Sequence, residues 1–224
     1  SGEKVSSGFF YGLCASLIFG LYPLHCEAVS WITGRVDAIV TAFICLAVLS
    51  YRNWRKKKSK LYFALTFLFS ILGLLSKEMA ITLPFIFFAY SLMLEKSDEN
   101  SKLFFRLGLS LRGSISFFVL LIFYFGLRFF SLGTFIGGYD NSFLPASDPL
   151  HFINTWIHGL RMFLIPLNRE VIPSSHPFTW AWFFILFATV CLFIYNLFSA
   201  SLYRKLSLFN FSFLLLAFLP VYKL

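Results

Sequence analysis

The chain has 224 residues, of which 58% are hydrophobic and 13% charged, and its mean hydropathy is +0.78. These values exclude a water-soluble enzyme, a coiled coil and a disordered tail, and they predict an integral membrane protein. The net charge of +9 does not indicate a nucleic-acid partner, because the basic residues are concentrated in short segments between apolar stretches. The lipid bilayer is therefore the first partner that the composition predicts.

Apolar segments follow one another along the whole chain. Most are about 17 to 20 residues long, which as a helix crosses a hydrocarbon core of ~30 Å. They cover approximately residues 8–24, 36–51, 61–75, 79–94, 114–130, 151–167, 180–198 and 206–222. We predict an all-α fold, a polytopic transmembrane bundle of about seven to eight helices that forms one domain over residues 1–224. Because the chain begins without Met and ends directly behind an apolar run, we expect it to be a piece of a longer protein, truncated at both ends.

The basic residues predict which side of the membrane each connection faces. Six of the nineteen Lys and Arg lie between Arg52 and Lys60, and four more lie between Lys96 and Arg112. Short connections with such clusters face the cytoplasm, so both are predicted to be cytoplasmic loops. The connections at 25–35 and 76–78 are then external.

The segment 23–37, with the sequence PLHCEAVSWITGRVD, places four ionisable side chains at the external mouth of the bundle. They are His25, Glu27, Arg35 and Asp37. Ionisable groups at membrane depth are costly, so they usually pair with one another or serve a site. The segment therefore predicts a substrate site, and the alternative is a simple ion pair between Arg35 and Asp37 at the start of a helix.

Lys77 and Glu78 interrupt what would otherwise be one apolar run from 61 to 94. We predict a tight external turn between two membrane spans at this point. A lysine at the mouth of the bundle is a compact cation suited to a phosphate group. The alternative is a hairpin whose turn merely requires two polar residues.

Segment 151–167 is amphipathic, because His158 and Arg161 fall on a polar helical face opposite an apolar one. We favour an interfacial or re-entrant helix here, which leaves Arg204 and Lys205 on the cytoplasmic side; the alternative is a spanning helix whose polar face lines the bundle interior. Arg161 and Arg128 would then sit at the same external level as the cations of the two earlier motifs. The four could form a cationic pocket, although snorkelling explains each arginine alone.

At these residues the chain resembles the membrane region of the O-mannosyltransferases that carry tetratricopeptide repeats, in the GT-C glycosyltransferase superfamily. The matching motifs are P-x-H-x-E-A-V-x-W-x-x-G-R-x-D at 23–37, L-S-K-E-M-A-I-T-L-P at 75–84, L-R-F-F-S-L-G at 127–133 and W-I-H-G-L-R-M-F-L-I-P-L at 156–167. The first two are the more specific. The chain departs from the familiar pattern at Cys26, where threonine is more usual.

The resemblance implies a GT-C-like enzyme, a multi-pass glycosyltransferase of the bacterial inner membrane or the endoplasmic reticulum membrane. It would perform O-mannosylation or a similar reaction, moving a sugar from a polyprenyl-phosphate donor to a protein or glycan acceptor at the external or luminal face. The catalytic base is expected in a loop upstream of Ser1, and the tetratricopeptide repeats are expected after the last span. The catalytic residue is therefore unknown, and the chain alone is expected to be inactive.

Within that reaction, cations must stabilise the departing phosphate, a task suited to Arg35 and Lys77. The remaining candidates would support these two or contact substrate, and they are His25, Glu27, Asp37, Glu78, Arg128, His158 and Arg161. We expect neither a cofactor nor a metal ion, because no cluster of ligand residues is evident in the sequence. The alternative function is a non-catalytic membrane scaffold or transporter that retains the fold.

Overall fold

The computed structural model describes residues 2–21, 34–95, 103–133, 177–199 and 201–218. All regular secondary structure in these ranges is helical, which confirms the predicted all-α class for the described part. The elements are α1 (Gly2–Gly20), α3 (Arg35–Lys57), α4 (Lys60–Ser76), the 3-10 helix η1 (Glu78–Thr82), α5 (Leu83–Leu94), α6 (Leu103–Leu132), α8 (Pro177–Phe198) and α9 (Ser201–Phe218). The segment 151–167 lies outside the described residues, so the total of seven to eight apolar helices stays a prediction.

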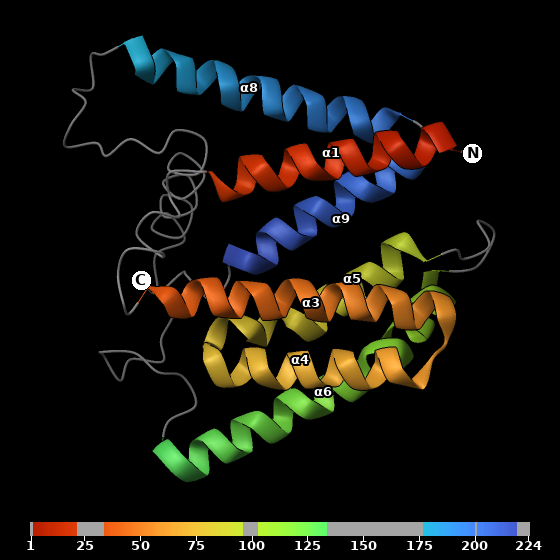
Figure 1. The fold of residues 1–224 in the computed structure, drawn as a ribbon, viewed down its shortest axis with the longest axis vertical. Coiled ribbons are helices and arrows are strands. Elements are labelled where there is room, and N and C mark those ends of the chain that lie inside the picture. The colour runs from red at the N-terminus through yellow and green to blue at the C-terminus, as the bar shows by residue number, and fades with distance from the viewer. Residues whose placement is uncertain (1, 22–33, 96–102, 134–176, 200, 219–224) are drawn as a thin grey trace.

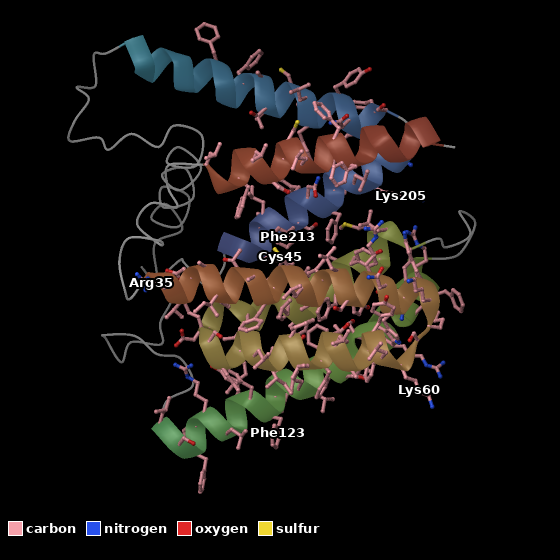
Figure 2. The ribbon with its side chains drawn as sticks, viewed as in Figure 1. Arg35, Cys45, Lys60, Phe123, Lys205 and Phe213 are labelled. Carbon is pink, nitrogen blue, oxygen red and sulfur yellow. The ribbon has the colours of Figure 1, made fainter. Side chains whose placement is uncertain are left out.

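The helices run back and forth, so their connections gather at two ends of the bundle (Figure 1). One end, on the left of the figure, holds the start of α3 and the turn between α4 and η1; we call it the Lys77 end. The opposite end holds the α3–α4 turn and the start of α9; we call it the Lys60 end. Figure 2 shows Lys205 at the same end as Lys60.

Helix α3 continues six residues beyond the predicted apolar segment, to Lys57. Its last turn carries Arg55, Lys56 and Lys57, whose charges interact favourably with the negative end of the helix dipole. Lys58 then adopts the left-handed conformation (φ 54°) and donates its backbone N–H to the Trp54 carbonyl at 2.7 Å, which ends the helix. The prediction of a loop from Arg52 to Lys60 is therefore wrong: most of that segment is helix.

Helix α6 likewise begins well before the apolar segment predicted at 114–130. Its first turns contain Arg106, whose Nη2 donates to the Leu92 carbonyl of α5 at 2.9 Å. The last carbonyls of a helix have no partner within their own helix, so this contact satisfies one of them and joins α6 to α5. The predicted cytoplasmic loop after Lys96 is shortened accordingly.

The interior of the bundle combines stacked aromatic rings with small hydroxyl side chains. Tyr51 of α3 stacks on Phe87 of α5 with ring centroids 4.4 Å apart, and Phe87 meets Phe117 of α6 at 4.7 Å. The buried polar residues of the described part are all serine or threonine, and they are Ser50, Thr66, Ser70, Thr82, Ser91, Ser110 and Ser114. Small residues at helix interfaces allow close packing and are characteristic of membrane bundles.

The outer surface is apolar instead. In the described part of the chain, two helical stretches are long and apolar enough to cross a membrane, Arg35–Lys57 and Phe104–Leu132. Only 22% and 11% of their most apolar windows are buried. The core helix of a soluble protein would be mostly buried, whereas α6 exposes Ile122 and Phe130 at 71% and 91%. An exposed apolar surface around an interior containing serine and threonine indicates a membrane protein.

Gly113 of α6 leaves room for the guanidinium of Arg55, and this gives a first prediction. A Cβ at position 113 would lie 2.5 Å from Nη1 and 2.9 Å from Cζ of Arg55. The guanidinium cannot move aside freely, because its Nε and Nη2 both bind the carboxylate of Glu95. We expect Gly113→Ala to lower the free energy of unfolding by about 1–3 kcal/mol, measured by SDS titration of the detergent-purified full-length protein.

The matched control for this variant is Gly126→Ala in the same helix. No atom lies within 4 Å of the Cβ position at Gly126, so an added methyl group meets open space there. The control should be neutral or slightly stabilising, because alanine favours helix more than glycine does. If Gly113→Ala were as stable as Gly126→Ala, the guanidinium of Arg55 would have moved aside for the new methyl group, and the predicted clash would be disproved.

Candidate functional site: ion pairs at the Lys77 end

A tight turn presents Lys77 and Glu78 at one end of the bundle. Helix α4 ends at Ser76, and Lys77 is extended (φ −161°, ψ 152°), with its N–H bonded to the Gly73 carbonyl at 3.1 Å. Gly73 allows η1 to approach α4 closely, because a Cβ there would lie 3.2 Å from Cβ of Ala80, which is a tight contact. The chain changes from the extended Lys77 to the 3-10 helix η1 at Glu78, and the two side chains reach different helices, α3 and α6.

Two ion pairs connect this turn to the neighbouring helices. Nζ of Lys77 binds Oδ1 of Asp37, in the first turn of α3. Oε1 of Glu78 accepts a hydrogen bond from Nη2 of Arg128 in α6 at 2.6 Å. The sequence motifs around Asp37, Lys77 and Arg128 are thereby brought to one end of the bundle, and the partner of Lys77 is Asp37 rather than the adjacent Glu78.

The two pairs differ in how enclosed they are. The side chain of Arg128 is 12% exposed and that of Glu78 35%, whereas Lys77 and Asp37 are 32% and 40% exposed. Arg128 also donates from Nη1 to the hydroxyl of Tyr124 at 2.8 Å, while its buried Nε has no hydrogen-bond partner. The Glu78–Arg128 pair is therefore the more firmly held of the two. The Asp37–Lys77 pair is more accessible to a ligand from outside the bundle.

The environment of Glu78 keeps its carboxyl group ionised. Burial alone would raise the pKa of Glu78, but hydrogen bonds from its own backbone amide and from Arg128, with the positive charges of Arg128 and Lys77, lower it overall. Because the pKa is lowered in the fold, the stabilisation is present above the unfolded value and is lost as pH falls through the folded value. The Glu78–Arg128 pair is intact at neutral pH.

Arg35 stands apart from both pairs. It is the first residue of α3 and is exposed, and its guanidinium makes no ion pair within the described residues. Residues two positions apart do not face each other on a helix, which explains why Asp37 pairs with Lys77 instead. The alternative of an Arg35–Asp37 pair at the helix start is thus wrong. Each of the two pairs is neutral, and Arg35 adds one positive charge at the start of α3 that no carboxylate of the described residues pairs with.

The remaining predicted site residues lie outside the described part of the chain. They are His25, Glu27, His158 and Arg161. Their place in the site stays a prediction. Ser1 lies outside the described part as well, and the catalytic base expected upstream of it also stays a prediction.

Tyr124, by contrast, is a residue of the site that the sequence did not predict. Its hydroxyl accepts the hydrogen bond from Arg128, and its position four residues earlier in α6 puts both side chains on one helical face. That spacing is the signal in the sequence that could have found it. Among the described residues, no group of three His, Cys, Asp or Glu side chains is placed to hold a metal ion.

Part of the chain is similar to known protein O-mannosyl-transferases. Protein O-mannosyl-transferase Tmtc1 of Drosophila melanogaster is 37% identical over 70 residues, which is 31% of this chain and 8% of that protein. Protein O-mannosyl-transferase Tmtc2 of the same organism is 31% identical over 96 residues, 40% of this chain and 10% of that protein. No family model matches the chain, and no solved structure matches it. The aligned part spans about one tenth of these relatives, so an activity of the whole protein is a proposal.

Proposed function

We propose that the protein is an integral-membrane glycosyltransferase, similar to O-mannosyltransferases, that moves a sugar from a polyprenyl-phosphate donor to a protein or glycan hydroxyl at the Lys77 end. The observation that carries the proposal is a cluster of two ion pairs, Asp37–Lys77 and Glu78–Arg128, at one end of a helical bundle that is partly similar to two protein O-mannosyl-transferases. Such a cluster at membrane depth is costly and is usually functional.

The chemistry assigns a task to each described residue of the cluster. The acceptor oxygen forms a bond to the anomeric carbon of the sugar while the bond from that carbon to the donor phosphate oxygen breaks. The acceptor proton passes to a base that we expect upstream of Ser1. Negative charge develops on the departing polyprenyl phosphate. Arg35, exposed and unpaired within the described residues, and Lys77 stabilise that charge, while Arg128 fixes Glu78 and with it the turn.

Asp37 has an unusual role in this proposal, because it competes with the donor phosphate for Lys77. We expect Asp37→Asn to tighten the binding of a polyprenyl phosphate to the purified full-length protein, by up to about fivefold. The expected change in affinity is this small because a partly exposed ion pair contributes at most ~1 kcal/mol, which corresponds to about a fivefold change in the dissociation constant. Native mass spectrometry of the protein with the lipid would measure the change.

The control for this prediction is Asp37→Glu, which keeps a competing carboxylate and should leave the affinity near that of the wild type. Lys77→Gln should weaken binding of the same lipid. If Asp37→Asn weakened binding instead, Asp37 would be a substrate contact or a structural support, and the competition for Lys77 would be disproved.

The direct test is transfer by the purified full-length protein. Radiolabelled mannose on a polyprenyl-phosphate donor should appear on a protein acceptor only when the enzyme is present. A specific observation favours the alternative of a non-catalytic scaffold or transporter: Lys77 and Arg128 are already neutralised by internal carboxylates. Binding of the donor without any transfer to protein or glycan acceptors would support that alternative.

A further inference from the structure

The Lys60 end carries a second concentration of charge that the proposed reaction does not use. Five exposed cations lie on the last turns of α3, the following turn and the first residue of α4. We call them the basic rim, and they are Arg52, Lys56, Lys57, Lys58 and Lys60. Figure 2 shows Lys60 at this end, together with Lys205 of α9, far from Arg35.

Among the described residues, the acidic group at this end of the bundle does not neutralise the rim. Glu95, at the end of α5, binds Nε and Nη2 of Arg55 through both of its oxygens. Arg55 is 11% exposed in this pair and also faces Trp54, with Cζ 5.4 Å from the ring centroid. Both carboxylate oxygens of Glu95 are thus occupied by the enclosed Arg55. The five exposed cations of the rim remain available to an external anion.

The surroundings of the rim place it at the level of lipid headgroups. Leu49 and Leu61, close to the rim in sequence, are 51% and 65% exposed, and Phe104, in the first turn of α6, is 88% exposed. Lys57 extends over Tyr62, with Nζ 5.1 Å from the ring centroid and 3.4 Å from the hydroxyl. Tyrosine and long basic side chains next to a lipid-facing apolar surface mark the interface between hydrocarbon and water.

We propose that the basic rim binds the headgroups of anionic phospholipids in the leaflet at the Lys60 end. A phospholipid suits this surface, because its phosphate can meet the exposed ammonium groups while its acyl chains cover the exposed Leu49 and Leu61 beside them in sequence. A soluble anion would match the charge alone. The lipid is also the anion that the bilayer presents at this depth, and clusters of four to eight basic residues at a helix end are typical of such sites.

The experiment measures which lipid the full-length protein retains. The protein is equilibrated in micelles containing equal amounts of phosphatidylglycerol and phosphatidylcholine, and the lipids that stay bound are counted by native mass spectrometry. We expect a preference for phosphatidylglycerol of roughly tenfold in the wild type. Replacing four rim residues, by Lys56→Gln, Lys57→Gln, Lys58→Asn and Lys60→Gln, should reduce that preference to near unity.

Asparagine is chosen at position 58 because Lys58 has a positive φ of 54°, which asparagine tolerates better than glutamine. The matched control replaces the same four lysines by arginine and should keep the preference. Should the neutral variant fail to fold, the wild type gives a second measurement, because raising NaCl to about 0.5 M should lower the preference by screening exposed charges.

Three outcomes would overturn the inference. They are an unchanged preference in a folded neutral variant, a preference in the wild type that salt does not alter, and loss of the preference when inorganic phosphate is added at a concentration equal to that of the lipid. The last would identify the rim as a site for soluble anions. None of these results bears on the proposed sugar transfer, which depends on the Lys77 end.

Discussion

Lys77→Ala in the full-length protein should slow sugar transfer by more than a hundredfold under the proposed function. A cation beside the departing phosphate contributes more as negative charge develops, so its loss raises the barrier by about 3 kcal/mol. The effect on folding should be small, because the Lys77–Asp37 pair is partly exposed and such pairs contribute little to stability. Transfer per folded molecule and the SDS unfolding midpoint, measured on the same preparations, separate the two effects.

Two further variants sharpen this comparison. Lys77→Arg should recover only part of the activity, since a planar guanidinium and a compact ammonium do not place their charge alike. Lys60→Ala removes an exposed cation from the opposite end and should leave transfer unchanged. Unchanged activity per folded molecule in both Lys77→Ala and Arg35→Ala would remove these residues from the donor site.

The approach of the Asp37, Lys77 and Arg128 motifs could be predicted because each stands where an apolar segment meets a connection. The partner of each charged residue could not be predicted from the sequence. In a membrane bundle the outward face is as apolar as the inward one, so hydrophobic periodicity does not reveal which way a helix is rotated. That rotation decides that Asp37, rather than Arg35, faces Lys77, and that Arg128 reaches Glu78.

The helix limits predicted from hydropathy are wrong for a related reason. Hydropathy reports the part of a helix that lies in hydrocarbon, whereas the hydrogen-bonded backbone of α3 continues to Lys57 and that of α6 begins at Leu103. Basic side chains do not stop a helix at the interface, because they extend toward water while the backbone stays helical. Hydropathy therefore predicts a loop at Arg55, although this residue lies in α3 with its side chain only 11% exposed.

Removing the partner of this arginine gives the largest loss of stability that we expect. Glu95→Ala should lower the free energy of unfolding by about 3–5 kcal/mol, because it leaves the guanidinium of Arg55 buried without its counter-ion. The pair is the most enclosed of the three in the described residues, with side chains 11% and 21% exposed. SDS titration of the purified full-length protein would measure the change.

Asp37→Ala is the matched control, since it removes one carboxylate from a pair whose members are 32% and 40% exposed, and it should cost less than about 1 kcal/mol. Replacing both Arg55 and Glu95 by apolar residues, Arg55→Met with Glu95→Leu, should recover most of the loss, because no charge is then left buried. If Glu95→Ala and Asp37→Ala cost the same, enclosure would not determine the strength of these pairs. If the double replacement were as unstable as Glu95→Ala, the stability would depend on the hydrogen bonds of the pair rather than on an unpaired charge.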